Sequence, residues 1–240
     1  MQKYKKTNDY TYALGTELTL EVLKRHPREV LSVYIHSKQI DNQIYQEIID
    51  LCEKEKIEVV RSDKAFHIVN AKENCYMMAS FKKFDNPIEK NRNHVVLVNP
   101  SNMGNLGSII RSILGFGIYD LAIITPAVDI YDPKVIRATM RAFFLLRFSF
   151  YSSFEDYLTE NPNNTIYPFM LDGKQRLQDV EIKTPYSLVF GNEATGLDES
   201  YQRFNSVYIE QLDTIDSFNL NNAVSIGAYQ FTLNKINSND

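Results

Sequence analysis

The pattern of hydrophobic and polar positions predicts helices and strands in turn over the first third of the chain. Apolar residues recur every three or four positions across residues 17–26 and 41–56, which is typical of amphipathic helices. Runs rich in β-branched and aromatic residues at 30–36 and 57–60 predict strands. We therefore expect this part of the chain to form a small mixed α/β domain.

A strand, a helix and a second strand are predicted from residue 94 onward. Residues 94–98 and 119–125 are mostly apolar, and a helix is expected between them from about residue 105. One face of that helix carries five apolar residues, namely Leu106, Ile109, Ile110, Ile113 and Leu114. A strand–helix–strand unit of this kind predicts a parallel sheet with a right-handed crossover.

The same alternation continues to the end of the chain. Asp132 and Pro133 favour the start of a helix that runs to about residue 143. A closing helix is expected at 219–236, and strands are expected at 145–151, 166–171, 187–190 and 206–209.

One polar, proline-containing stretch, residues 84–93, is the best candidate for a linker. It divides the chain into a small α/β domain at 1–83 and a parallel-sheet domain at 94–240. The predicted fold class is α/β.

Composition narrows the class of protein. The 240 residues are 44% hydrophobic and 23% charged, which is ordinary for a soluble globular protein. No apolar run is long enough to span a membrane, and the basic N-terminus lacks the apolar core of a signal peptide, so we expect a cytoplasmic protein. The two cysteines and four histidines are scattered, and no metal-ligand spacing is present.

The balance of charged residues limits the kind of binding partner. Twenty-six basic residues against 30 acidic residues give a net charge of −4. Proteins that hold nucleic acid by bulk charge are usually basic, so this balance argues against a non-specific polyanion coat. A local basic patch remains compatible with it.

The first candidate site is the glycine-containing segment 99–111, NPSNMGNLGSIIR, between a predicted strand and helix. A glycine-rich loop in this position is typical of a phosphate cradle, but Gly104-x-x-Gly107 is not the complete dinucleotide fingerprint. A tight strand–helix turn is the alternative. Arg111 lies off the apolar stripe, so burial in the core does not explain it.

Two further segments have candidate chemistry. In 188–197, LVFGNEATGL, an apolar strand ends at Gly191 and Glu193, where α/β sheets bind ligands; Glu193 could equally cap the next turn. In 217–223, SFNLNNA, three asparagines open the closing helix despite poor propensity, which favours a polar site over a simple cap at Ser217. The small residues Ala223, Gly227 and Ala228 permit close helix packing, within the chain or in a dimer.

Together the three segments resemble the motifs of the SpoU (TrmH-type) RNA ribose 2′-O-methyltransferases of the SPOUT superfamily. The first motif, Asn-x-Gly-x-x-x-Arg, matches residues 105–111. The second, Gly-x-Glu with a following glycine, matches 191–193 and Gly196, and the third, Ser-Leu-Asn, matches 217–219 with Phe218 in place of leucine. The resemblance covers residues 94–236, and the N-terminal part loosely resembles the substrate-binding domain of such enzymes.

The resemblance implies a parallel-sheet domain with a deep trefoil knot, whose loops hold S-adenosylmethionine. Gly191, Ile209 and Phe218 are then the expected cofactor contacts. It also implies a homodimer that methylates ribosomal or transfer RNA and needs no metal.

The expected catalytic residues are Asn105, Arg111, Glu193, Ser217 and Asn219. Arginine is almost always protonated, so Arg111 is expected to anchor a phosphate and stabilise the developing alkoxide. The other four are expected to orient the hydroxyl, the cofactor and Arg111.

The sequence departs from the family pattern at several positions. Arg137 matches a family arginine, but Arg141 replaces a glycine; the two are four residues apart on a predicted helix, where they bind phosphate or are solvated. Tyr76-Met77 stands where relatives often have Gln-Gly. These departures and Phe218 keep a second hypothesis open, a SPOUT-fold RNA-binding protein with weak or no activity. An unrelated nucleotide-binding enzyme, such as a dehydrogenase, is a third.

Overall fold

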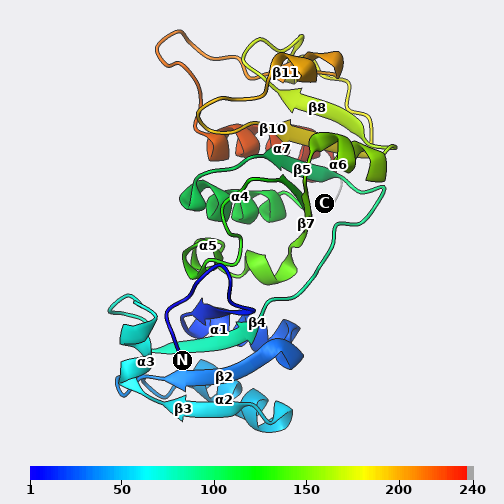
Figure 1. The fold of residues 1–240 in the computed structure, drawn as a ribbon. Coiled ribbons are helices and arrows are strands. Elements are labelled where there is room, and N and C mark those ends of the chain that lie inside the picture. Colours follow the sequence, from blue (N-terminus) through cyan, green and yellow to red (C-terminus); the bar gives the residue numbers. More distant parts are fainter. Residues whose placement is uncertain (237–240) are drawn as a thin grey trace. The chain divides into compact units, whose positions relative to one another are not determined.

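The chain is divided into two units, each described by itself. The structure, a computed structural model, describes residues 1–236, with side chains through residue 233. Unit 1 comprises Met1–Asp85 and Asp129–Phe144, and unit 2 comprises the rest (Figure 1). Residues 129–144 were expected in the second domain but belong to unit 1. Residues 86–93 were expected in the linker but belong to unit 2. Residues 237–240 of the expected second domain lie outside the described residues.

Unit 1 is built on a four-stranded mixed sheet with strand order β1-β4-β2-β3. Only β2 and β3 are parallel. The strands are β1 (Tyr10–Leu14), β2 (Val30–Ile35), β3 (Glu58–Arg61) and β4 (Met77–Lys82). The helices are α1 (Thr16–Arg25), α2 (Gln43–Glu55), α3 (Asp63–Ile68) and α5 (Pro133–Ala138). The two helices and two strands predicted in this part are confirmed, whereas β1, β4 and α3 were not predicted.

Helix α5 is shorter than predicted. It ends at Ala138, and Met140 adopts a left-handed backbone with φ of 58°, so the helix expected to reach residue 143 stops five residues early. Arg137 and Arg141 therefore do not share a helix face, and that prediction is wrong. Arg141, itself exposed, instead forms an ion pair at 3.8 Å with the largely covered side chain of Glu21.

Unit 2 contains the predicted parallel sheet, with strand order β7-β6-β5-β10-β8-β11-β9; Figure 1 labels β5, β7, β8, β10 and β11. The strands are β5 (His94–Val98), β6 (Asp120–Ile124), β7 (Arg147–Tyr151), β8 (Thr165–Phe169), β9 (Gln175–Arg176), β10 (Tyr186–Phe190) and β11 (Val207–Tyr208). The helices are α4 (Met103–Gly115), α6 (Phe154–Glu160) and α7 (Leu220–Ile236). Strand β10 comes after β8 in the sequence but lies between β5 and β8 in the sheet.

Both faces of this sheet are covered, which explains its apolar strands. On one face, Phe154 and Tyr157 of α6 pack in a cluster with Val96 and Val189. On the other, α7 lies beside α4, and its Phe231 contacts the rings of two tyrosines on β8 and β10. No helix in the described part of the chain is long and apolar enough to cross a membrane.

The small residues of α7 allow close packing within the chain. A Cβ added to Gly227 would lie 2.6 Å from the ring of Phe169, and Ala228 is fully buried. Ala223 lies at the start of the same helix, where it lines a cleft. Close packing inside unit 2 accounts for these small residues, so they give no support to a dimer.

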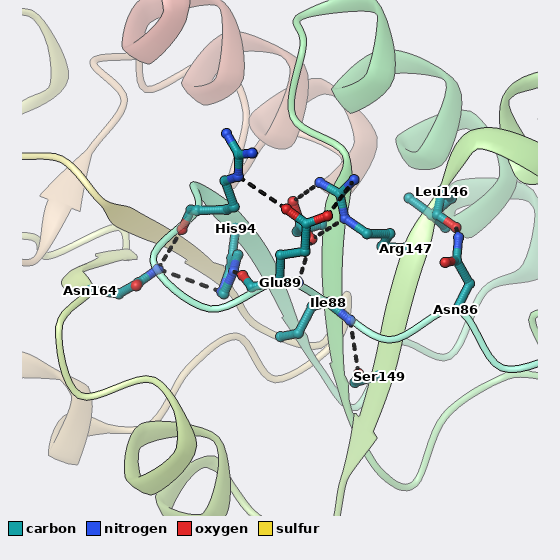
Figure 2. Close-up of polar contacts among 10 residues, drawn as sticks. Asn86, Ile88, Glu89, His94, Leu146, Arg147, Ser149 and Asn164 are labelled. Carbon is teal, nitrogen blue, oxygen red and sulfur yellow. Dashed lines mark hydrogen bonds and ion pairs between the residues drawn. The ribbon is translucent and has the colours of Figure 1, made fainter.

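Segment 86–93 is hydrogen-bonded to the edge strand β7 of the unit 2 sheet, as Figure 2 shows. Phe148 of the edge strand β7 donates to the carbonyl of Asn86 at 2.6 Å, and Ser149 Oγ accepts from Ile88 N. This pairing covers part of an edge that would otherwise present unpaired backbone groups. The segment is thus a strap bound along unit 2.

A charged cluster fixes the middle of the strap (Figure 2). The Arg147 guanidinium donates to both oxygens of Asp120, at 2.7 and 2.6 Å, and lies 3.4 Å from the carboxylate of Glu89. Glu89 N also donates to Asp120 at 2.9 Å. Asp120 is only 2% exposed, and these donors compensate for its burial.

His94, fully buried at the start of β5, completes the cluster. Its Nε2 donates to the Glu89 carbonyl at 2.8 Å, since a carbonyl only accepts. In the neutral imidazole, Nδ1 accepts from the Tyr157 hydroxyl at 2.8 Å, and Tyr157 in turn accepts from Ser187. Burial, which lowers the pKa of His94, favours this neutral imidazole with the proton on Nε2.

The buried histidine predicts a loss of stability in acid. Burial lowers the pKa of His94 below its usual 6.5, despite the opposing effects of the Glu89 carbonyl and Asp120. Below pH 6.5 the unfolded chain therefore binds a proton that the folded chain does not, and stability falls as pH decreases. The expected slope is at most about 1.4 kcal/mol per pH unit from this group.

Urea unfolding between pH 7 and pH 5 measures this slope in wild type and in His94→Gln. The variant should lose less stability on acidification. His26, whose pKa is also lowered by burial, is present in both proteins, so the difference isolates His94. Equal slopes would contradict the neutral, hydrogen-bonded histidine.

Candidate functional site

A cleft of about 470 Å³ opens at the carboxyl ends of the unit 2 strands. Its walls are the segments that follow β8 and β10, residue Ile209 just after β11, and the start of α7. The strand order reverses next to β5, and ligands of open α/β sheets bind at such positions. The fold therefore places the second and third candidate segments around one cavity.

Glu193 joins the second segment to the first. Its Oε2 accepts from the backbone N and the hydroxyl of Ser101, at 3.0 and 2.7 Å. Its Oε1 accepts from Asn102 N and from the Asn105 side chain, both at 3.2 Å. Four donors thus hold one carboxylate, and the loop before α4 is fixed to the loop after β10.

The environment of Glu193 keeps it ionised. Partial burial works to raise its pKa, but the hydrogen bonds from Ser101 and Asn105 outweigh it and hold the pKa below its usual value. An ionised carboxylate engaged by four donors is suited to positioning a loop and poorly suited to acid–base chemistry. The alternative that Glu193 caps the next turn is therefore wrong, because its partners lie on the first segment.

Asn105 also connects the first segment to the third. Its side-chain oxygen accepts from Nδ2 of Asn219 at 3.3 Å, while its own Nδ2 donates to Glu193. The residues are 114 positions apart in the sequence, and the fold brings them into direct contact. One asparagine thus links all three candidate segments.

Asn219, and not Ser217, caps the closing helix. The Asn219 side chain accepts from Asn221 N at 2.9 Å, and α7 begins at Leu220. Ser217 lies exposed on the cleft wall and makes no side-chain hydrogen bond within the described residues. The simple cap considered for Ser217 is therefore wrong, and its hydroxyl faces no competing partner among the described residues.

Glycine at position 191 is required by the closeness of the backbone. A Cβ there would lie 2.2 Å from the carbonyl carbon of Gly196 and 2.5 Å from Leu197 N. Gly196 itself has a φ of 68°, in the left-handed region. The loop 191–196 therefore closes tightly on itself at the cleft.

The structure brings most of the expected site residues together. Six of them line the cleft: Gly191, Glu193, Ile209, Ser217, Phe218 and Asn219. Asn105 contacts two of these six. Arg111 does not line the cleft; it is exposed on α4 and has no hydrogen bond or ion pair with residues 1–236. Arg137 and Arg141 belong to unit 1.

Sequence reasoning missed several residues of the site. Asn102 caps α4 by accepting from Gly104 N and Asn105 N, which moves the start of the helix to Met103. An asparagine before an apolar helical stripe is a recognised start signal, so this residue could have been identified. Ser101 could not, because its partner Glu193 is distant in sequence.

The end of β8 and the residues that follow it are a second omission. Phe169, Met170, Leu171 and Asp172 line the cleft. The predicted strand covered all but Asp172, but only the three-dimensional sheet order shows that its end adjoins β10. Among the described residues, no group of three or more His, Cys, Asp or Glu side chains could hold a metal ion.

Comparisons with known proteins fit this geometry. Residues 92–229 match the model of the SpoU rRNA Methylase family. A candidate tRNA (cytidine(34)-2′-O)-methyltransferase of Listeria innocua is 33% identical over 145 residues, which are 58% of this chain and 85% of that protein. The 23S rRNA (uridine(2479)-2′-O)-methyltransferase of Streptomyces viridochromogenes is 28% identical over 160 residues, 62% of this chain and 55% of that protein.

Solved structures extend the likeness to nearly the whole chain. The AdoMet-bound rRNA methyltransferase from Sinorhizobium meliloti superposes with a TM-score of 0.82, covering 94% of this chain and 88% of that chain. Its sequence is 19% identical, so this likeness concerns the fold alone.

Proposed function

We propose, because the chain belongs to the SpoU rRNA Methylase family, that it transfers a methyl group from S-adenosylmethionine to a ribose 2′-hydroxyl of ribosomal or transfer RNA. The observation that carries the proposal is the contact of Asn105 with both Glu193 and Asn219 beside the cleft. Family membership makes the dehydrogenase alternative untenable.

The cleft has the character that this cofactor requires. Its volume of about 470 Å³ lies in the usual range for small-molecule sites, and its wall combines aromatic side chains with backbone groups. The Gly196 backbone fills the space beside Gly191, so the loop that lines the cleft is held in one compact shape. Gly191, Ile209 and Phe218 are the proposed contacts.

The bound cofactor supplies a methyl group on an electrophilic sulfonium. The protein's own task is then to position the ribose hydroxyl and to stabilise its developing negative charge. We assign positioning to Asn105, Glu193 and Asn219, and hydroxyl contact to Ser217, whose side chain has no partner in the described chain. Arg111, uncommitted to any described residue, anchors a substrate phosphate and stabilises the alkoxide.

RNA binding is assigned mainly to unit 1, as the resemblance implies. Basic residues exceed acidic ones by 17 to 15 in unit 1, whereas unit 2 has 9 basic and 15 acidic residues. A polyanion is repelled less by the first unit than by the second. Arg137 and Arg141 are part of this basic excess and are proposed as phosphate contacts.

A trefoil knot, a homodimer and a cytoplasmic location complete the proposal. The insertion of β10 between β5 and β8, with α7 packed beside α4, supports a knotted arrangement. The dimer is supported by the family resemblance and by Tyr229, which is 49% exposed on α7. An RNA substrate is the reason for the cytoplasmic location.

Replacing Glu193 or Asn219 with alanine should leave the fold intact and lower methyl transfer by about 10²-fold, because loss of either contact misplaces the first-motif loop. Transfer of labelled methyl groups to total cellular RNA measures the rate, and circular dichroism checks the fold. Asn163→Ala, an exposed asparagine paired with Asn91 outside the cleft, is the matched control. Wild-type turnover in both site variants would contradict the assignment, and no transfer by wild type would favour the inactive RNA-binding alternative.

A further inference from the structure

Two charged side chains line the cleft of unit 2, and both are acidic. They are Asp172, just after β8, and Glu193, just after β10. No lysine or arginine is part of the described wall. The cleft therefore carries a negative charge that is not balanced by a basic residue on its own surface.

The two carboxylates differ in what they already bind. Both oxygens of Glu193 are occupied by donors from the first-motif loop. The Asp172 side chain accepts no hydrogen bond and forms no ion pair within the part of the chain that the structure describes. Lys174, two residues further on, donates instead to the carbonyl of Phe204 at 3.5 Å.

The backbone at Asp172 is nevertheless held in place. Its carbonyl accepts from Gln202 Nε2 at 2.9 Å, and Gly173 N donates to the carbonyl of Met170. A Cβ on Gly173 would lie 2.5 Å from the backbone of Val207, so this turn is pressed against β11. An exposed carboxylate is thus presented at the cleft from a fixed turn.

We propose that Asp172 recognises the positive charge of the methyl donor. The proposal rests on the function proposed above. S-adenosylmethionine carries two cationic centres, the sulfonium and the α-ammonium, and one carboxylate. A carboxylate with no partner among the described residues, in a cleft whose described wall holds no basic residue, stabilises a cation there. Asp172 is then a specificity-determining residue of the cofactor site.

Asp172→Asn keeps the shape of the side chain and removes its charge. Calorimetry at low salt should show that S-adenosylmethionine binds about fivefold more weakly to the variant, the size expected for a largely exposed ion pair. 5′-Methylthioadenosine, which has neither cationic centre, should bind both proteins equally. Raising the salt concentration should reduce the difference for S-adenosylmethionine.

S-adenosylhomocysteine identifies the cationic centre. It keeps the α-ammonium and lacks the sulfonium. Equal weakening of S-adenosylhomocysteine and S-adenosylmethionine assigns Asp172 to the ammonium, whereas weakening of S-adenosylmethionine alone assigns it to the sulfonium. Either result supports charge recognition.

Asp213→Asn is the matched control, because Asp213 is exposed on the loop before α7 and does not line the cleft. Unchanged S-adenosylmethionine binding in Asp172→Asn would overturn the proposal. Equal weakening of 5′-methylthioadenosine, or equal weakening by Asp213→Asn, would also overturn it. Failure of wild type to bind any of the three compounds would instead refute the proposed function. Asp172→Ser, tested in the same way, guards against a fold defect in one variant.

Discussion

Replacing Arg111 with lysine is expected to lower the rate of methyl transfer by about 10²–10³-fold while S-adenosylmethionine still binds. Lysine keeps the positive charge but loses the planar, bidentate geometry that suits a phosphate. Loss of one preorganised electrostatic donor typically has an effect of this size. Arg111 is outside the cleft wall, so binding of the cofactor should change little.

Single-turnover kinetics with saturating cofactor, together with calorimetry, separate these two effects. Lys134→Arg is a suitable control, because this residue is exposed on the first turn of α5 in unit 1 and its side chain makes no hydrogen bond with the described residues. If Arg111→Lys abolished cofactor binding and left the saturated rate unchanged, Arg111 would be a cofactor residue.

Gly191→Ala is expected to abolish measurable cofactor binding, a loss of at least about 10²-fold in affinity. The new methyl group would lie 2.2 Å from the backbone of Gly196, so the loop must open. Overpacking of this kind costs about 1–3 kcal/mol of stability, which a chain of this size tolerates. The variant should therefore fold but no longer bind S-adenosylmethionine in the cleft.

Gly115→Ala provides the matched control for this prediction. Apart from its chain neighbours and the backbone of its own helix, no described atom lies within 4 Å of a Cβ at position 115, and its backbone is not in the left-handed region. Calorimetry with S-adenosylmethionine and thermal melting should give wild-type values for this variant. Retained binding by Gly191→Ala would show that the loop is not the cofactor cradle.

Much of the unit 2 fold was predictable because its signals are local. Strand β5, helix α4 and strand β6 follow one another directly, and the apolar stripe of α4 is buried as predicted at Leu106, Ile109, Ile110 and Ile113. A strand–helix–strand unit admits essentially one handedness, so the parallel sheet followed from the sequence order.

The strands of unit 1 that escaped prediction lack a periodic signal. Four of five residues in β1 and five of six in β4 are buried, so polar and apolar positions do not alternate. Strand β4 also contains two methionines and an alanine, which are not strong strand formers. The early end of α5 was equally hidden, because nothing local to Met140 indicates its left-handed backbone.

Part of the site could likewise be predicted from local sequence, whereas the rest depends on contacts between residues that are distant in the sequence. Glycines and asparagines of the three motifs were identified from sequence, but the partners that hold Glu193 were not. Ser101 and Glu193 are 92 residues apart, and their contact depends on β10 lying beside β5. The strap was read as a linker for the same reason, since its partners Asp120 and Arg147 lie on later strands.

The most direct test of the central claim is to identify the methylated nucleoside. RNA from cells with and without the gene, and RNA methylated by the purified protein, are digested to nucleosides, which identify the modification, and to oligonucleotides, which locate it, and both digests are analysed by mass spectrometry. The expected result is a 2′-O-methylnucleoside at one defined position that is present only with the gene and is restored by the purified protein. A methyl group on a base, or identical methylation in both cell types, would contradict the account.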